Sequence, residues 1–239
     1  MSVLFMIRHG QATLDGSNYD QLSPLGRVQA EMLGTLWAKQ RFVVDYAYSG
    51  TQTRHRDTAH LVAAGYREAG LNFPEVIPDE RFNEIDSFDF LEKIYNLLLH
   101  HEAGFRSLTK DTRHALDTNS PEKYVLFDRC MQMIMTAWIE ERFPDAEALS
   151  WDDYRNLVLS TQADLAQLPP ESRIAVFTSG NPIAIYAGRA GDAPTGEIRG
   201  IAHRLLNTAV SHFTLNGAGI TLESLNETPH LGEAYRTQK

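Results

Sequence analysis

Apolar runs of strand length alternate with helix-patterned segments along most of this chain of 239 residues. The clearest runs are 3–7 and 173–178, and an unbroken apolar run is typical of a strand buried on both faces. Helical segments between such strands supply the long crossovers that parallel pairing requires. The pattern predicts an α/β fold, a three-layer sandwich with a mostly parallel central sheet and helices on both faces.

The expected elements follow from periodicity and from turn residues. Strands are expected at 3–7, 42–48, 75–78, 173–178, 209–215 and 220–225, and the last two are expected to form a hairpin through Asn216-Gly217. Helices are expected from Pro24 to about Leu36 and at 51–68, 88–101, 105–116, 121–143, 151–168 and 183–189. Ser23 before Pro24 is a typical helix start, since Ser caps and Pro suits the first helical position.

Between about 86 and 150 the strand-like runs disappear and only helical patterns remain. In 121–143, Phe127, Met131, Ile134 and Trp138 follow helical spacing. We interpret 86–150 as a helical cap insertion within a single domain that covers 1–239. An insertion in this position is expected to overhang the ends of the strands and to select the substrate.

Charge and composition exclude several classes of protein. The chain has 22 Lys and Arg against 31 Asp and Glu, a net charge of −9, which argues against nucleic acid as a partner. The single cysteine, Cys130, excludes an intrachain disulfide. No apolar stretch approaches the roughly 20 residues of a membrane span, and the N-terminal run does not have the pattern of a signal peptide. We therefore expect a cytoplasmic protein without a membrane partner.

Polar residues follow three of the predicted strands. They are Arg8-His9-Gly10-Gln11, the segment 49–56 with Arg54 and Arg56, and Thr178-Ser179-Gly180-Asn181. Because ligands bind beyond the carboxyl ends of the strands in such sheets, these segments are expected to converge. Two guanidinium groups and a helix N-terminus around one imidazole suit a phosphate dianion. The alternative, that Arg8 and His9 merely end a strand, is weakened by the agreement of three strand ends.

These residues resemble the signature of the histidine phosphatase superfamily, in its phosphoglycerate mutase-like group. The resemblance lies in Arg8-His9-Gly10, in Leu22-Ser23-x-x-Gly26-x-x-Gln29-Ala30, in Ser49-Gly50 with Arg54 and Thr58-Ala59, and in Asn83-Glu84. The matches run to about Glu84 and resume near Arg173. One such motif alone would be weak, whereas four in order are specific.

The resemblance implies a role for each matched residue. His9 would be the nucleophile, Arg8 and Arg54 would hold the phosphoryl oxygens, and Glu84 would be the general acid. The phosphate-binding set would be Arg8, Gln11, Ser23, Arg54, Ser179 and Gly180. No metal ion and no other cofactor is implied.

Ser179 departs from the family pattern, which has a second histidine after this strand. A serine hydroxyl donates one hydrogen bond but carries no positive charge, and losing a preorganised donor costs about 10²–10³ in rate. We therefore expect weak or substrate-specific activity, and a gain in rate from Ser179→His. Another histidine could take the place of the missing one, and His55, His203 and His212 are candidates that the sequence does not rank.

The favoured function is hydrolysis of a small phosphomonoester through a phosphohistidine. The alternatives are a catalytically impaired phosphate-ester binding or regulatory protein and a phosphoglycerate mutase-type phosphotransferase. The basic residues of the insertion are scattered, which favours the hydrolase over a mutase that must hold a bisphosphate. A serine hydrolase built on Ser179 lacks the flanking glycines, since Phe177 and Asn181 occupy those positions. The partner is then a small phosphorylated substrate, and a homodimer stays open.

Overall fold

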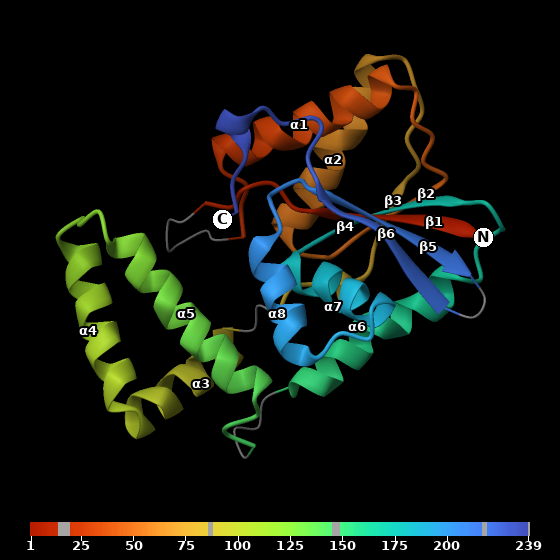
Figure 1. The fold of residues 1–239 in the computed structure, drawn as a ribbon. Coiled ribbons are helices and arrows are strands. Elements are labelled where there is room, and N and C mark those ends of the chain that lie inside the picture. The colour runs from red at the N-terminus through yellow and green to blue at the C-terminus, as the bar shows by residue number, and fades with distance from the viewer. Residues whose placement is uncertain (14–19, 86–87, 145–148, 217–218, 239) are drawn as a thin grey trace. The chain divides into compact units, whose positions relative to one another are not determined.

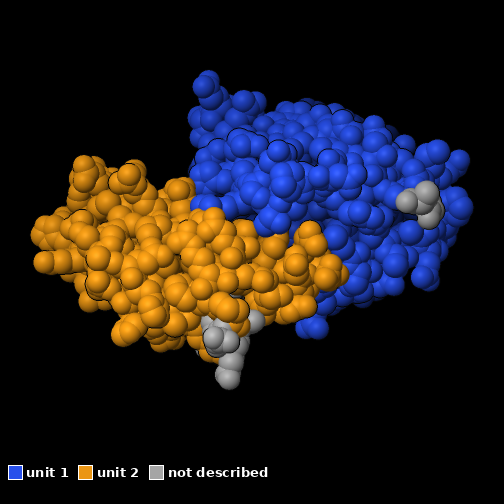
Figure 2. All heavy atoms as spheres, turned by 60° about the horizontal axis from the view of Figure 1, so that its bottom comes forward, with its two compact units in different colours: residues 1–84, 157–239 blue, residues 85–156 orange. Residues whose placement is uncertain are grey.

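The computed structural model describes residues 1–13, 20–85, 88–144, 149–216 and 219–238 (Figure 1). The chain divides into two compact units, Met1–Glu84 with Leu157–Lys239 and Ile85–Asn156 (Figure 2). The first unit contains the sheet, and the second is helical. Gly217 of the predicted hairpin turn lies outside the described residues.

The sheet of the first unit has six strands in the order β3-β2-β4-β1-β5-β6. The strands are β1 (Ser2–Arg8), β2 (Tyr46–Ser49), β3 (Val76–Pro78), β4 (Arg173–Thr178), β5 (Val210–Asn216) and β6 (Gly219–Glu227). The pairs β3-β2, β2-β4 and β4-β1 are parallel, whereas β5 and β6 join antiparallel at one edge. The predicted α/β fold with a mostly parallel sheet is confirmed.

Helices cover both faces of this sheet (Figure 1). The α-helices of the first unit are α1 (Pro24–Lys39), α2 (Thr53–Glu68), α7 (Gly180–Ala190), α8 (Thr195–Arg204) and the second half of α6 (Trp151–Leu165), with short 3₁₀ turns η1 (Glu80–Phe82) and η2 (Glu233–Tyr235). α1 and α2 lie on one face, and α6 and α7 lie on the other (Figure 1). No helix in the described ranges is long and apolar enough to cross a membrane.

The N-terminal strand is buried on both faces because its alternate side chains enter different layers. Phe5 and Ile7 pack in the core beneath α1 and α2, together with Trp37 of α1. Leu4 and Met6 are completely buried, and strand alternation directs them to the opposite face.

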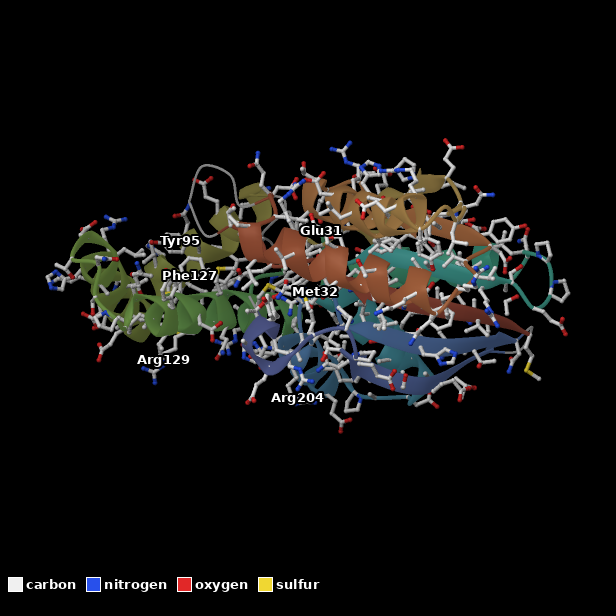
Figure 3. All side chains as sticks on the ribbon, turned by 90° about the horizontal axis from the view of Figure 1, so that it is seen from above. Glu31, Met32, Tyr95, Phe127, Arg129 and Arg204 are labelled. Atoms are coloured by element: carbon white, nitrogen blue, oxygen red, sulfur yellow. The ribbon has the colours of Figure 1, made fainter. Side chains whose placement is uncertain are left out.

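On α1, Glu31 is exposed while the adjacent Met32 is half-buried (Figure 3).

The sequence-based prediction of β2 is wrong at its start. The strand begins at Tyr46 rather than Phe42. The Phe42 ring stacks on Trp37 at 4.8 Å between centroids, and its carbonyl accepts a hydrogen bond from Tyr66 Oη at 2.7 Å. The apolar residues after α1 therefore close the core under the helices instead of pairing with a strand.

Helix α8 was not anticipated from the sequence. It is polar, contains two glycines, and buries only Ile198 in its span. That side chain packs against Gly188 of α7, where a Cβ atom would lie 2.4 Å from Ile198 Cγ1. One apolar side chain thus packs α8 against α7. Because no second buried residue follows at helical spacing, the sequence has no apolar periodicity that would indicate this helix.

The crossing of α1 and α2 depends on two glycines. A Cβ on Gly34 would lie 2.6 Å from the Val62 carbonyl oxygen, and one on Gly65 would lie 2.6 Å from the Gly34 carbonyl carbon.

We expect Gly34→Ala to lower the free energy of unfolding by about 1–3 kcal/mol, because backbone must move to admit the methyl group. Urea unfolding measures this. Gly196→Ala is the control: nothing lies within 4 Å of its Cβ position, so the helix gains up to about 1 kcal/mol of propensity. Equal changes in both variants would contradict the packing argument.

The second unit consists of α3 (Phe88–His101), α4 (Ala103–Asp117), α5 (Lys123–Ile139) and the start of α6. Trp138 is buried against Trp151 with ring centroids 5.3 Å apart and donates its indole N–H to the Leu149 carbonyl at 2.7 Å. Cys130 is buried, and its Sγ lies 3.3 Å from Thr112 Oγ1. Phe127 is 44% exposed, although its helical spacing matches that of the buried Trp138.

Candidate active site

The three polar segments that follow β1, β2 and β4 meet at one edge of the sheet. β4 lies between β1 and β2, with Arg8 opposite Thr178 and Ser49 opposite Phe177. The His9 N–H donates to the Thr178 carbonyl at 2.8 Å. The convergence expected from parallel strand ends is present.

The ring of His9 is held in one tautomer. His9 is 7% exposed, and its Nδ1 lies 2.7 Å from the carbonyl oxygen of Gly10. A carbonyl only accepts hydrogen bonds, so Nδ1 carries the proton and Nε2 carries the lone pair. Burial, and then the charges of Arg54 and Arg8, hold the pKa of His9 well below 6.5. The imidazole is therefore neutral at neutral pH and presents a nucleophilic nitrogen.

Gly10 is required by the protein backbone itself. A Cβ on Gly10 would lie 2.3 Å from the Gly26 carbonyl oxygen, and one on Gly26 would lie 2.1 Å from the Gln11 carbonyl oxygen. The space that a side chain at position 10 would need is therefore occupied by the first turn of α1. The Gly10 N–H also donates to Thr58 Oγ1 at 3.0 Å, which ties the end of β1 to α2.

Ser23 caps α1 and orients Gln11. Its Oγ accepts from the Gly26 N–H at 3.0 Å and donates to Gln11 Oε1 at 2.8 Å. Because the hydroxyl proton is engaged by Gln11, the structure favours a positioning role for Ser23 over the direct phosphate contact expected from the sequence. The Gln11 N–H donates to Gln29 Oε1 at 2.9 Å.

Arg54 is a buried cation in the first turn of α2. Its side chain is 2% exposed, and Nη1 donates to Asp20 Oδ1 at 2.9 Å. Asp20 Oδ2 also accepts from the Thr53 N–H at 2.8 Å, so one carboxylate stabilises both the helix start and the guanidinium. Arg8 donates Nη1 to the Leu205 carbonyl. The two guanidinium groups make the surroundings of His9 electropositive.

Glu84 is held at the start of α7. Its Oε1 accepts from Asn181 Nδ2 at 2.7 Å, and its Oε2 accepts from the Asn181 N–H at 3.3 Å. Gln52 Oε1 accepts from the Glu84 N–H at 3.0 Å and from Arg54 Nη2 at 3.2 Å. Gln52 thus links the buried arginine to the carboxylate residue.

Ser179 is 1% exposed and stands at the N-cap of α7, directly before Gly180. Its Oγ lies 2.7 Å from Nε2 of His55, a completely buried residue whose ring centroid is 5.6 Å from that of His9. Of the three histidines that the sequence left unranked, His55 is the one that lies beside His9. His212 stacks on Phe5 at 4.9 Å, and His203 is exposed on α8.

Asp20 was missed by the sequence analysis. Gln52 and Asn181 were included only as members of the segments 49–56 and 178–181, without a role for either. Gln52 and Asn181 lie within two residues of motif positions, which is the one local signal that could have indicated them. Among the described residues, no group of three or more His, Cys, Asp and Glu side chains is placed to hold a metal ion.

Comparison with known proteins identifies the family. A sequence model of the histidine phosphatase superfamily (branch 1) matches residues 4–134. The mitochondrial serine/threonine-protein phosphatase Pgam5 of Caenorhabditis elegans is 23% identical over 186 residues, 70% of this chain. The aligned part spans 64% of the length of that relative.

Solved structures share the fold. YhfR of Bacillus stearothermophilus has a TM-score of 0.62 at 15% identity, with 96% of this chain and 99% of that chain covered. A phosphoserine phosphatase of Entamoeba histolytica in complex with 3-phosphoglyceric acid has a TM-score of 0.59 at 18% identity, covering 97% and 100%. Phosphoglycerate mutase of Bacillus anthracis has a TM-score of 0.60 at 16% identity, covering 96% and 94%. With its sequence match over more than half its length and its strand-end site around His9, this chain belongs to the histidine phosphatase superfamily.

Proposed function

We propose that this protein is a phosphatase that hydrolyses a small phosphomonoester through a phosphohistidine at His9. The observation that carries the proposal is the state of the His9 ring. Its Nδ1 proton is donated to the Gly10 carbonyl, so the lone pair on Nε2 is available beside two guanidinium groups. A residue that only bound phosphate would need a donor at this position rather than a lone pair.

The reaction proceeds in two steps. His9 Nε2 attacks phosphorus while the ester P–O bond breaks, and Glu84 gives its proton to the leaving oxygen. Water then attacks the phosphohistidine, Glu84 takes a proton from it, and the P–N bond breaks to release inorganic phosphate and His9. Glu84 must hold a proton at the start, and the dianion of the substrate favours that protonation.

Arg8 and Arg54 counter the charge that spreads over the phosphoryl oxygens. The guanidinium of Arg54 donates hydrogen bonds to Asp20 and Gln52, so its position is set before the substrate binds. We place Gln11, Ser179 and Gly180 around the same oxygens, with Ser23 orienting Gln11. The substrate is left open beyond its chemical class.

The test is chemical trapping of the intermediate. A ³²P-labelled aryl phosphate is mixed with the wild-type protein in EDTA, and the protein is then denatured. The stability of the protein-bound label is measured in acid and in base. We expect label that survives base and is lost in acid, as for a P–N bond, together with EDTA-resistant release of phosphate. Acid-stable label would place the intermediate on a hydroxyl such as that of Ser179. Phosphate binding without label or turnover would favour the binding-protein alternative, and label that passes to a second acceptor rather than to water would favour a mutase.

A further inference from the structure

His55 is a buried titratable group for which the proposed reaction has no role so far. It lies in the first turn of α2, next to Arg54, and is completely buried. Its Nε2 is 2.7 Å from Ser179 Oγ, across 124 residues of sequence, and its ring lies beside that of His9. Its Nδ1 has no hydrogen-bond partner in the described part of the chain.

The backbone is shaped to admit this ring. A Cβ on Gly50 would lie 2.2 Å from His55 Nδ1, so any other residue at the end of β2 would displace the imidazole. Burying an imidazole with one nitrogen unsatisfied costs stability, and an apolar side chain in the same space would not incur that cost. A locally unfavourable choice of this kind is typical of functional sites.

The hydrogen-bond pattern selects a tautomer for His55. A buried N–H without an acceptor is rarer than a buried lone pair without a donor, so the proton belongs on Nε2 rather than on Nδ1. Nε2–H then donates to Ser179 Oγ. Burial and Arg54 lower the pKa of His55 well below 6.5, which keeps the ring neutral with this single proton. Since Ser179 Oγ accepts from His55, its own proton points elsewhere, and it makes no capping bond to the first turn of α7.

We propose that His55 and Ser179 form a two-residue donor, in which His55 orients and polarises the Ser179 hydroxyl so that it donates to a non-bridging oxygen of the phosphoryl group transferred to His9. This rests on the proposed function at His9. Ser179 contacts the substrate in this arrangement, while His55 is a positioning residue. No proton is transferred along the pair, so the balance of the two-step reaction is unchanged.

The pair changes what is expected of Ser179→His. An imidazole at position 179 would need the space that His55 fills, because the present Oγ is already 2.7 Å from Nε2. We expect the single variant to lose activity rather than gain it, and the double variant His55→Ala with Ser179→His to recover part of that loss. A single variant faster than the wild type would show that His55 is not needed.

The matched variants are His55→Gln and His55→Leu. The amide nitrogen of glutamine can reach the position of Nε2 and donate to Ser179, whereas leucine fills the space without a donor. We expect kcat to fall less than about tenfold in the first and by about 10²–10³ in the second, with KM little changed. Ser179→Ala should match the leucine variant, and combining the two should cost no more than either alone. The pairing would be overturned if the kcat losses of His55→Leu and Ser179→Ala multiplied in the double variant. It would also be overturned if His55→Gln and His55→Leu lost kcat equally.

A second readout does not depend on turnover. The ¹⁵N–¹H spectrum of the imidazoles in the wild-type protein, with His55 assigned by its absence in His55→Gln, should show the Nε2–H tautomer. Inorganic phosphate should shift this resonance in the wild type and much less in Ser179→Ala. An Nδ1–H tautomer, or no shift of His55 while His9 responds, would overturn the pair and leave the phosphatase proposal intact. If the spectra are as expected but the protein hydrolyses no phosphomonoester, the pair stands as a hydrogen-bond donor to phosphate and the proposed phosphatase function is wrong.

Discussion

Replacing His9 by alanine should lower kcat for an aryl phosphate by at least about 10⁴, because the variant loses the nucleophile and with it the two-step route. Binding should survive in part, since both guanidinium groups remain. The comparison is steady-state hydrolysis without added metal, with inorganic phosphate binding measured on the same samples. In the wild type, kcat/KM should not fall as the pH drops through 6.5, because the pKa of His9 lies well below that value.

His203→Ala is the matched control for this measurement. His203 is an exposed histidine on α8, so its loss removes an imidazole without touching the strand-end site. Its turnover should equal that of the wild type. A His9→Ala protein that folds and keeps more than a small fraction of wild-type turnover would rule out His9 as the nucleophile.

The strand-end residues could be predicted because their positions depend on local pattern. An unbroken apolar run defines β1, and the residue after a buried strand in a parallel sheet must lie at its carboxyl edge. That reasoning reaches Arg8, His9, Arg54 and Ser179 without any tertiary information. It also predicts the order of strands and helices around them, with the exception of α8, which was not anticipated.

The partners of those residues could not be predicted in the same way. The contact of Asn181 with Glu84 joins residues 97 apart, and that of His55 with Ser179 joins residues 124 apart. Local pattern shows that a histidine occurs in a helix but not which strand end it meets. His55 could therefore not be distinguished from His203 or His212 until the crossing of α2 over β4 was known.

Gly10 shows a different limit of sequence reasoning. A glycine beside a candidate nucleophile indicates close approach, but the sequence does not say what approaches. Here the backbone of Gly26 lies against it, so the glycine serves the docking of α1. The same docking brings Ser23 and Gln11 to the site, which makes the packing of α1 part of the construction of the phosphate pocket.

Mild acid should destabilise this protein through three buried histidines. Burial lowers the pKa of His9 and His55 well below 6.5 and that of His230 to about 4. In the unfolded chain each regains a pKa near 6.5, so the unfolded state binds more protons as the pH falls below that value. The stability is therefore complete above about pH 6.5 and is lost progressively below it.

Each histidine contributes a slope of up to about 1.4 kcal/mol per pH unit, so three should cost about 3 kcal/mol between about pH 6.5 and pH 5.5. Urea unfolding at a series of pH values measures this, against a typical total stability of about 5–15 kcal/mol. His230→Gln tests the assignment, because His230 bonds Thr208 Oγ1 at 2.8 Å and the glutamine amide can replace it without titrating. Between about pH 6.5 and pH 5.5, the free energy of unfolding of that variant should fall by about a third less than that of the wild type. A flat stability profile would mean that the folded protein takes up these protons at the ordinary pKa, which would remove the neutral, buried state of His9 on which the proposed chemistry depends.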